Sequence, residues 1–301
     1  MAKILNAPEV RAGTTAFWAV DKVILAYFAF TTVLILGWWG RIPSAAALFA
    51  THAVAAALLV LEAKWPNPTA RVFRNWYPLP YVAYCYREMA VLIPAVRGTD
   101  GDRWLANLDF RIWLANPTVW LERVQYPALV ELFQVAYTLF VPAVLFVAFL
   151  LWRKRLEPEF QYYAFLIALG FLVSYIGYLI VPARGPRFLL NHLQHIPLRG
   201  LWLFGAMQST LDRLESAHFD CFPSGHTELT LLAFWGSRMV SKRLFRVYFA
   251  YTPFLIFATV YLRYHYTVDV IAGAVVALVL ILTSPALYRG LSKGSMAIGR
   301  N

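Results

Sequence analysis

The sequence predicts an all-α integral membrane protein, built as a bundle of about eight spanning helices. Hydrophobic residues make up 60% of its 301 residues, charged residues only 14%, and the mean hydropathy is +0.56. Soluble globular domains carry about 25% charged residues. The apolar residues also gather in runs close to the ~20 residues with which a helix crosses a bilayer. This composition excludes an ordinary soluble domain.

Eight apolar runs follow one another along the chain, and each has about the length of a membrane crossing. The third run carries Arg87 and Glu88 at its middle, which we interpret as a pair satisfied against neighbouring helices. With a cytoplasmic N-terminus and eight crossings, more than half of the 27 basic residues fall on short inner segments, as the positive-inside rule expects. The predicted runs are 18–40, 42–63, 77–96, 127–151, 160–182, 222–240, 245–263 and 267–287.

These runs suggest three parts of the chain. Residues 1–126 form a predicted N-terminal membrane extension, 127–290 a core helix bundle and 291–301 a cytoplasmic tail. The first residues lack the apolar core and cleavage site of a signal peptide, so we expect the first span to remain as an anchor. The segment 98–127, which is rich in tryptophan and arginine, leads into the core bundle. It predicts either an amphipathic helix lying in the membrane interface or a folded outer loop that caps the bundle.

The positive balance of the chain, +11 with a pI near 9.7, does not indicate nucleic-acid binding. The basic residues occur in short clusters between apolar runs, and no groove-reading motif is present. Cys85 and Cys221 offer neither a metal-ligand spacing nor a disulfide framework, and we expect no metal and no cofactor. The lesser alternative is a zinc site on the outer loops, although the spacing fits no common ligand set: His192, His195, His218 and Asp220.

One stretch, TVYLRYHYTVDVIAG at 259–273, places ionisable groups inside an apolar region. If it is helical around His265, then Asp269 lies on the same face, where its carboxylate can orient the imidazole. Ionisable groups in a membrane segment are costly, so such a pair indicates a functional site. The alternative is an aspartate that satisfies a buried histidine for packing alone.

Two further clusters reach the same, outer, membrane face under this topology. In VPARGPRF at 181–188, Arg184 and Arg187 are held by neighbouring prolines and a glycine, and paired guanidiniums suit a phosphate. In DCFPSGHT at 220–227, Ser224 indicates a helix start followed by His226, and the N–H groups of such a start favour anions. The 39 residues from His226 to His265 accommodate one helix inward and one helix back.

The blocks PARGPR, FPSGHT and RYHYTVDVIAG together resemble the type 2 phosphatidic acid phosphatase superfamily over about 160–290. The resemblance implies a catalytic helical core within 127–290 and a metal-independent phosphoric ester hydrolase or phosphotransferase. It implies that His265 is the nucleophile, Asp269 its orienting partner and His226 the general acid. It also implies the phosphate ligands, which are Ser224, Gly225, Arg184 and Arg187.

The sequence departs from the family pattern in two places. The family usually has a lysine in the first block, where Gly177 and Ile180 stand at the candidate positions here. It usually has an arginine six residues before the nucleophile, where this chain has Thr259. We expect Arg263 to supply the missing positive charge to the phosphate.

We therefore expect an integral-membrane lipid phosphatase or phosphotransferase that works through a phosphohistidine at the outer face. Its partners would be the membrane and a lipid phosphate or phospholipid substrate. A looser resemblance to inositol phosphorylceramide synthases suggests an alternative, a head-group transferase with a small alcohol such as inositol as acceptor. An alternative of another class is a transporter, although no inverted repeat or broken helix is evident.

Other polar residues inside the predicted spans are expected to join helices. His52 is interpreted as a hydrogen-bonded core residue. Glu131, Gln134 and Tyr137 share one face of the fourth span, where they join helices or line a lipid pocket. Glu228 either tunes the nearby histidine or faces the bundle interior.

Overall fold

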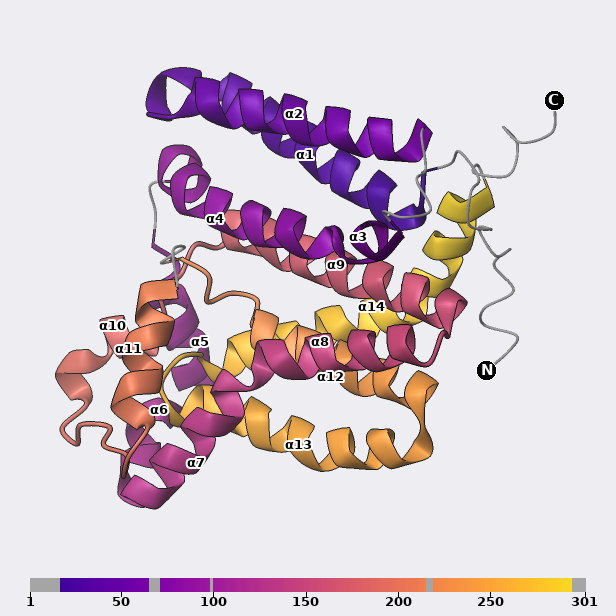
Figure 1. Ribbon diagram of the computed structural model, residues 1–301. Coiled ribbons are helices and arrows are strands. Elements are labelled where there is room, and N and C mark those ends of the chain that lie inside the picture. The colour runs from indigo at the N-terminus through magenta and orange to yellow at the C-terminus, as the bar shows by residue number, and fades with distance from the viewer. Residues whose placement is uncertain (1–16, 65–70, 98–99, 215–218, 294–301) are drawn as a thin grey trace.

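The computed structural model describes residues 17–64, 71–97, 100–214 and 219–293. Within these ranges the chain is a bundle of α-helices, and its one β-type contact is an isolated bridge between Ala183 and Asp220. The all-α prediction is confirmed (Figure 1). Parts of the sequence predictions lie outside the described residues. They are residues 1–16 of the N-terminal extension, residues 294–301 of the tail, and His218 of the alternative zinc site.

The helices fall into an N-terminal layer, a short-helix region and a core. The N-terminal layer comprises α1 (Ala19–Gly37), α2 (Ala45–Lys64), α3 (Arg71–Trp76) and α4 (Pro78–Val96). The short helices are α5 (Asp102–Trp113), α6 (Pro117–Trp120), α10 (Pro186–Leu189) and α11 (Phe204–Leu214). The core comprises α7 (Pro127–Thr138), α8 (Phe140–Arg153), α9 (Glu157–Ile180), α12 (Gly225–Val240), α13 (Lys242–Tyr261) and α14 (Thr267–Lys293).

Five of the described helices are long and apolar enough to cross a membrane: α1, α2, α9, α13 and α14. The pair α7 and α8, which is bent by 42°, counts as a sixth if it forms one span. α12 has only 16 residues, and α4 carries Arg87 and Glu88. If α7 and α8 count as one span, α4 and α12 are the two predicted crossings that are not among the candidate spans. The predicted number of eight crossings is therefore not confirmed. An integral membrane protein with several spans is supported.

The core is organised around α12, which packs against α8, α9, α13 and α14. α9 in turn contacts α1 and α4, so it joins the N-terminal layer to the core. Figure 1 shows the N-terminal helices as one layer beside α9, while α12, α13 and α14 lie together beyond it. The short helices α5, α6, α10 and α11 gather at one end of the core. This end carries the candidate site.

Buried polar pairs hold the N-terminal layer together. His52 from α2 lies 2.8 Å from the Glu88 carboxylate of α4, and its other ring nitrogen lies 2.7 Å from the hydroxyl of Thr32. His52 is therefore the core residue that was predicted. Glu88 is thus satisfied against a neighbouring helix, as predicted, whereas Arg87 is exposed and the prediction does not hold for it. Glu88 points to the neighbouring helix because burial makes an unpaired carboxylate costly.

The tryptophan-rich segment folds against the core as α5 and α6. The Asp109 carboxylate accepts hydrogen bonds from the backbone N–H groups of Thr267 and Val268, both at 2.9 Å, which cap the start of α14. Trp104 and Trp113 of the segment are exposed, and the indole N–H of Trp113 donates to the Thr267 hydroxyl at 2.7 Å. The segment is thus a folded cap on the bundle, as one of the two alternatives predicted, and it also presents aromatic side chains to its surroundings.

Candidate active site

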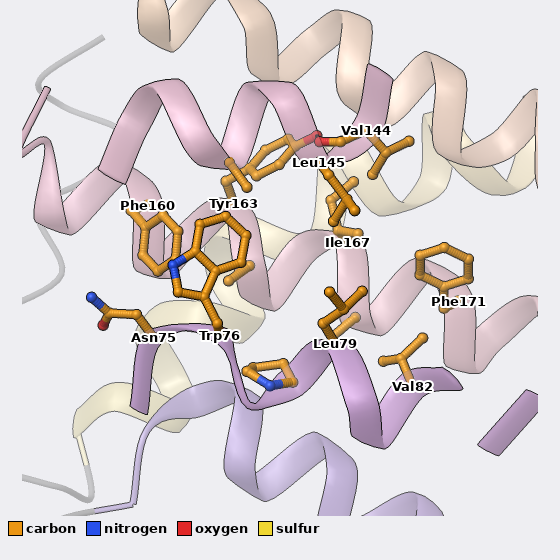
Figure 2. Close-up of a pocket in the computed structure, with 14 residues that line it drawn as sticks. Asn75, Trp76, Leu79, Val82, Val144, Leu145, Phe160, Tyr163, Ile167 and Phe171 are labelled. Atoms are coloured by element: carbon orange, nitrogen blue, oxygen red, sulfur yellow. The ribbon is translucent and has the colours of Figure 1, made fainter. Parts of the chain in front are cut away.

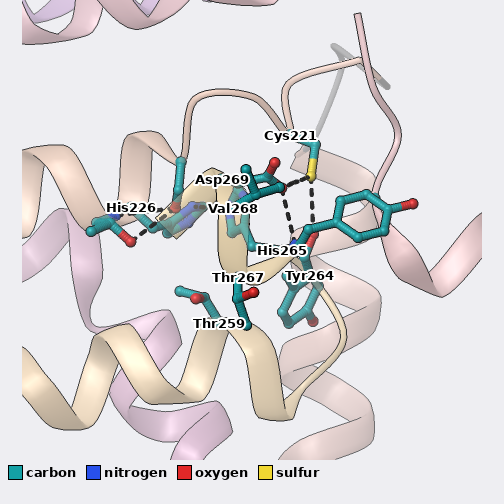
Figure 3. A network of polar contacts seen from close by, with 12 residues as sticks. Cys221, His226, Thr259, Tyr264, His265, Thr267, Val268 and Asp269 are labelled. Atoms are coloured by element: carbon teal, nitrogen blue, oxygen red, sulfur yellow. Dashed lines mark hydrogen bonds and ion pairs between the residues drawn. The ribbon is translucent and has the colours of Figure 1, made fainter. Parts of the chain in front are cut away.

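His226 and His265 come together at the end of the core, although they are 39 residues apart in sequence. His226 lies in the first turn of α12, and His265 lies in the turn that joins α13 to α14. His265 Nε2 is 3.4 Å from His226 Nδ1 (Figure 3). The pairing predicted from the return of the chain to one face is present. The two imidazoles are close enough to act on one phosphate.

The predicted relationship between His265 and Asp269 is also present, but its cause is different. His265 precedes the start of α14 at Thr267, so the two residues do not share a helix face. Instead, Asp269 lies in the first turn of α14 and its Oδ2 is 3.6 Å from His265 Nδ1. The backbone N–H of Tyr266 donates to the same Oδ2 at 3.0 Å. The carboxylate therefore orients both the ring and the turn that carries it.

A Schellman motif at the end of α13 sets the position of His265. The N–H of Arg263 donates to the carbonyl of Val260 at 3.0 Å, and the N–H of Tyr264 donates to that of Thr259 at 2.9 Å. The N–H of His265 also donates to the Thr259 carbonyl, at 3.1 Å. Thr259, where the family usually has an arginine, thus contributes its main chain to the site.

The start of α12 is fixed against α14 by close backbone contact. The N–H of Ser224 donates to the Asp269 carbonyl at 3.1 Å, and Ser224 Oγ caps α12 by accepting from the N–H of Thr227. A Cβ on Gly273 would lie 2.4 Å from the Ser224 carbonyl oxygen, so only glycine allows this approach. Ser224 is buried, and its hydroxyl serves as a helix cap. Its predicted contact with phosphate stays a prediction that these contacts do not favour.

Cys221 completes the group around Asp269, and the sequence interpretation gave it no role. Its Sγ lies 2.7 Å from Asp269 Oδ2 and 3.6 Å from His265 Nδ1 (Figure 3). Burial raises the pKa of the Cys221 thiol, and the charge of Asp269 raises it further. The thiol therefore stays protonated and donates to the carboxylate. The sequence feature that could have indicated a role for Cys221 is its position directly before the FPSGHT block.

The same three side chains form the metal-ligand group found among the described residues. The donor atoms of Cys221, His265 and Asp269 lie within 4.8 Å of one another. A metal would need the cysteine as thiolate. In this structure the Cys221 thiol is placed to donate a hydrogen bond to Asp269 Oδ2.

Aromatic rings hold His226 in place. Tyr137 stacks on His226 with a centroid distance of 4.3 Å, and Tyr264 stacks on the Tyr137 ring, also at 4.3 Å. Phe140 contacts the His226 ring at 4.4 Å. Tyr137, predicted to join helices or line a pocket, therefore does both, since it also lines a cavity beside His226. The sequence placed Tyr137 on one face with Glu131 and Gln134 but gave no signal for its stacking on His226.

The other polar residues of the predicted spans join segments, as expected. The Glu131 carboxylate accepts hydrogen bonds from the backbone N–H groups of residues 201–204, which fixes the start of α11. Gln134 accepts from the hydroxyl of Tyr264 at 3.4 Å. Glu228 is fully buried against α9, where it accepts from the Ser174 hydroxyl, so it faces the bundle interior.

Two arginines of the first block lie near the site. Arg184 is exposed and its guanidinium lies over the Phe188 ring at 4.6 Å. Arg187 is half-buried, pairs with Asp212 of α11 at 2.8 Å and lies over the Tyr264 ring at 4.9 Å. Tyr264 immediately precedes His265, which places Arg187 beside the turn that carries His265.

The buried carboxylate of Asp102 holds the loop that carries these arginines. It accepts hydrogen bonds from the N–H groups of Arg184, at 2.6 Å, and Gly185, at 2.8 Å, and from the Tyr266 hydroxyl at 2.9 Å. Gly185 has φ +103°, a conformation that favours glycine. Asp102 was not singled out in the sequence, because nothing local distinguishes it from other helix-starting aspartates.

Arg263 is engaged elsewhere. Its guanidinium is buried and donates to the Glu122 carboxylate at 2.9 Å, to the Gln125 side chain at 2.9 Å and to the Ile196 carbonyl at 2.6 Å. None of these contacts involves His226 or His265. The contacts therefore favour a structural role for Arg263 over the predicted contact with phosphate.

A cavity of about 310 Å³ opens beside His226. Its walls are mainly apolar and come from α4, α7, α8, α9, α11 and α12, while Asp220, Tyr86 and His226 form polar parts of the lining. A smaller pocket of about 60 Å³ lies farther along α4, around Trp76 and Tyr163 (Figure 2). Both are lined by Leu79, Val82 and Phe171. The two pockets therefore adjoin along the face of α4.

The fold and the site define a class: an α-helical membrane protein with a histidine pair and an aspartate at the ends of its core helices. Residues 103–283 match the PAP2 superfamily, and the chain belongs to this family. The expected family is thereby confirmed.

One curated relative is a PA-phosphatase related-family protein of Dictyostelium discoideum. It is 30% identical over 135 residues, which cover 44% of this chain and 24% of that protein. The match thus spans about a quarter of the relative's length. No solved structure matches the chain.

Proposed function

We propose that the protein is a membrane lipid phosphatase or phosphotransferase that cleaves a lipid phosphate ester through a phosphohistidine on His265. The observation that carries the proposal is the position of the histidine pair at the end of a largely apolar cavity. His265 Nδ1 faces Asp269, so its Nε2 is the nitrogen turned toward His226. A nucleophile oriented by one partner and facing a proton donor is the arrangement that covalent catalysis needs.

The reaction proceeds in two steps. His265 Nε2 attacks phosphorus, the bond from phosphorus to the alcohol oxygen breaks, and His226 protonates the departing oxygen. In the second step water or an alcohol attacks the phosphohistidine, and His226 takes its proton. A phosphoryl group does not fit within the 3.4 Å between His265 Nε2 and His226 Nδ1, so substrate binding would separate these two nitrogens.

Positive groups beside the turn would bind the phosphate. Arg187 lies on Tyr264, next to the nucleophile, and a phosphate would compete with Asp212 for its guanidinium. Arg184, on the same loop, is exposed and available for a second contact. The first N–H groups of α12, at Gly225 and His226, point beyond the helix start and favour an anion. Together they would offset the charge that builds on the phosphoryl oxygens.

The cavity supports a lipid as the substrate. It lies on the His226 side of the pair, which is the side of the departing alcohol. Because most of its wall is aliphatic or aromatic, the alcohol that fits it is apolar. The adjoining pocket along α4 would extend the same apolar surface. The lipid tail would therefore follow α4 into the N-terminal layer.

The helix ends favour an outer-face enzyme over a transporter. Both histidines lie at ends of core helices, whereas a transporter is expected to place its charges near the membrane midplane. The opposite end of α12 and α13 carries Lys242 and Arg243. The positive-inside rule puts that basic turn in the cytoplasm and the histidines at the outer face.

A trapping experiment tests the proposal. Purified protein mixed with a labelled lipid phosphate should yield an acid-labile, base-stable phosphoryl adduct, and His265→Ala should yield none. His192→Ala is the matched control, because His192 is an exposed loop histidine that contacts the Leu189 carbonyl. Full turnover by His265→Ala would refute the nucleophile assignment. Labelling of a cysteine at position 184 exclusively from the cytoplasmic side would refute the outer-face assignment.

A head-group transferase of the inositol phosphorylceramide synthase type is the second candidate. It shares the phosphohistidine and differs only in the acceptor. The observation that favours it is the polar end of the cavity at Asp220 and Tyr86, which could hold an alcohol. Mass spectrometry of products from lipid extract with and without inositol separates the two, since only the transferase makes a new phospho-head-group lipid.

A further inference from the structure

The cavity beside His226 contains a carboxylate that the reaction above does not use. Asp220 precedes α12, and Tyr86 projects from α4 on the facing wall. The Tyr86 hydroxyl donates to Asp220 Oδ2 at 2.6 Å. The backbone of this segment is fixed by a bridge to Ala183, where the N–H of Cys221 donates to the Ala183 carbonyl at 3.1 Å. The carboxylate is thus held rigidly in a mainly apolar wall, where it is costly.

The charge of Asp220 decides what it can bind. An ionised carboxylate only accepts hydrogen bonds, and it repels a phosphate. Burial raises the pKa of Asp220, and the Tyr86 hydrogen bond and the charges of His265 and Arg187 limit that rise without cancelling it. The geometry shows the carboxyl group as an acceptor, since the Tyr86 hydroxyl donates to its Oδ2. A fitting ligand must therefore bring a hydrogen-bond donor to the His226 side of the site. In the proposed reaction, the molecule that brings a hydrogen-bond donor to this side is the phosphoryl acceptor, the water or alcohol that discharges the phosphohistidine.

Acceptors differ in the number of hydrogens that they offer. A water molecule carries two: one passes to His226, and the other remains on the oxygen. A monohydric alcohol has no hydroxyl hydrogen left after the transfer. A vicinal diol or a polyol retains a second hydroxyl beside the reacting one. Only water and such diols can therefore serve His226 and a carboxylate at the same time.

We propose that Asp220, held by Tyr86, forms an acceptor subsite that binds the hydroxyl hydrogen which is not transferred. The inference rests on the proposed function and specifies its acceptor. In the balanced step, the acceptor oxygen forms a bond to phosphorus as the bond from phosphorus to His265 Nε2 breaks. The electron pair of that bond returns to the imidazole, and the transferred proton goes to His226. The second hydrogen is shared with Asp220, so the site favours water and vicinal diols over simple alcohols.

The test uses 4-nitrophenyl phosphate, whose departing nitrophenolate is a good leaving group that needs little help from the subsite. Phosphohistidine formation then becomes nearly independent of Asp220. The purified protein is supplied with equal concentrations of ethanol and ethylene glycol, and the two phosphorylated products are measured. Loss of one hydrogen bond to a charged group corresponds to roughly a tenfold change or more. Asp220→Asn should therefore reduce the ratio of glycol product to ethanol product about tenfold.

Matched variants make the result specific. Tyr86→Phe should shift the ratio in the same direction while leaving the carboxylate in place. Tyr175→Phe is its control, because the Tyr175 hydroxyl bonds to the Val82 carbonyl and its ring lines the same cavity. Glu228→Gln is the control for Asp220, since Glu228 is a buried carboxylate on α12 that faces α9.

The outcomes separate the two proposals. An unchanged product ratio in both Asp220→Asn and Tyr86→Phe, with the adduct still formed, would overturn the subsite and leave the proposed function standing. An equal loss of the ratio in Glu228→Gln would also overturn it, because the preference would then be a general property of the fold. Wild-type protein that forms no phosphohistidine would overturn the proposed function, and this inference with it.

Discussion

The Cys221 thiol lies 2.7 Å from the same Asp269 oxygen that faces His265 at 3.6 Å. The carboxylate therefore accepts from a thiol while it orients the imidazole. Because the raised pKa of Cys221 keeps the proton on sulfur, the thiol supplies a hydrogen bond and no charge. Cys221 thus positions Asp269, and through it the proposed nucleophile.

Removing that hydrogen bond should weaken the reaction without abolishing it. We expect Cys221→Ala to lower kcat about three- to tenfold, because one hydrogen bond that positions Asp269 is lost. Cys221→Ser retains a donor and should recover part of the loss. The pH profile of kcat should shift in Cys221→Ala, since the Asp269 carboxylate has lost a hydrogen-bond donor. Cys85→Ala, in α4, is the control, and an equal effect there would contradict the assignment.

The stack of Tyr137 on His226 predicts that the ring, and not the hydroxyl, is needed. Tyr137→Phe should keep kcat within about twofold, whereas Tyr137→Leu should lower it about tenfold or more, because the His226 ring would lose its stacking partner. Steady-state rates of the two variants check this. Equal losses in both would show that the hydroxyl carries the effect.

Arg263 combines an unfavourable backbone conformation with a buried ion pair, so its variants can separate the two roles. Its φ is +67°, and the guanidinium meets Glu122 at 2.9 Å. Arg263→Ala and Arg263→Gly both lose the ion pair, but glycine tolerates the conformation better, by about 1 kcal/mol. We expect both variants to melt below wild type, and Arg263→Gly to melt above Arg263→Ala.

The same variants examine the phosphate role that the sequence predicted for Arg263. If its role is structural, KM for the phosphate substrate should change little in variant protein that remains folded. A large rise in KM with an unchanged melting temperature would restore Arg263 as a phosphate ligand.

Asp102 should make stability depend on pH. Burial, and next its contact with Asp100, raise the pKa of Asp102 to about 7 in the folded protein, from an ordinary value near 4. The fold therefore favours the protonated form, and the associated stability is present below about pH 4 and is lost as pH rises toward 7. Melting curves of wild type and Asp102→Asn should show a wild-type advantage that shrinks over this range. A difference that is constant with pH would contradict the shift.

Local sequence patterns were sufficient for the family and for locating the residues of the candidate site. The composition and the spacing of apolar runs gave a helical membrane protein, because a bilayer requires long apolar helices. FPSGHT and RYHYTVDVIAG carried His226, His265 and Asp269 within short motifs whose backbone conformation is largely local. The number of crossings was less certain, because the length and charge of α4 and α12 do not by themselves show whether a helix spans.

The tertiary structure decided what depends on long-range packing. It placed His265 in a turn instead of a helix, and it paired the Arg263 guanidinium with the Glu122 carboxylate. It also made the main-chain carbonyl of Thr259 part of the site. It also brought Cys221 to Asp269 and Tyr86 to Asp220, pairs that are 48 and 134 residues apart in sequence. No local pattern encodes such contacts, since they exist only once the helices pack. The sequence by itself determined the family and the candidate residues His226, His265 and Asp269, and the fold determined which neighbours contact them.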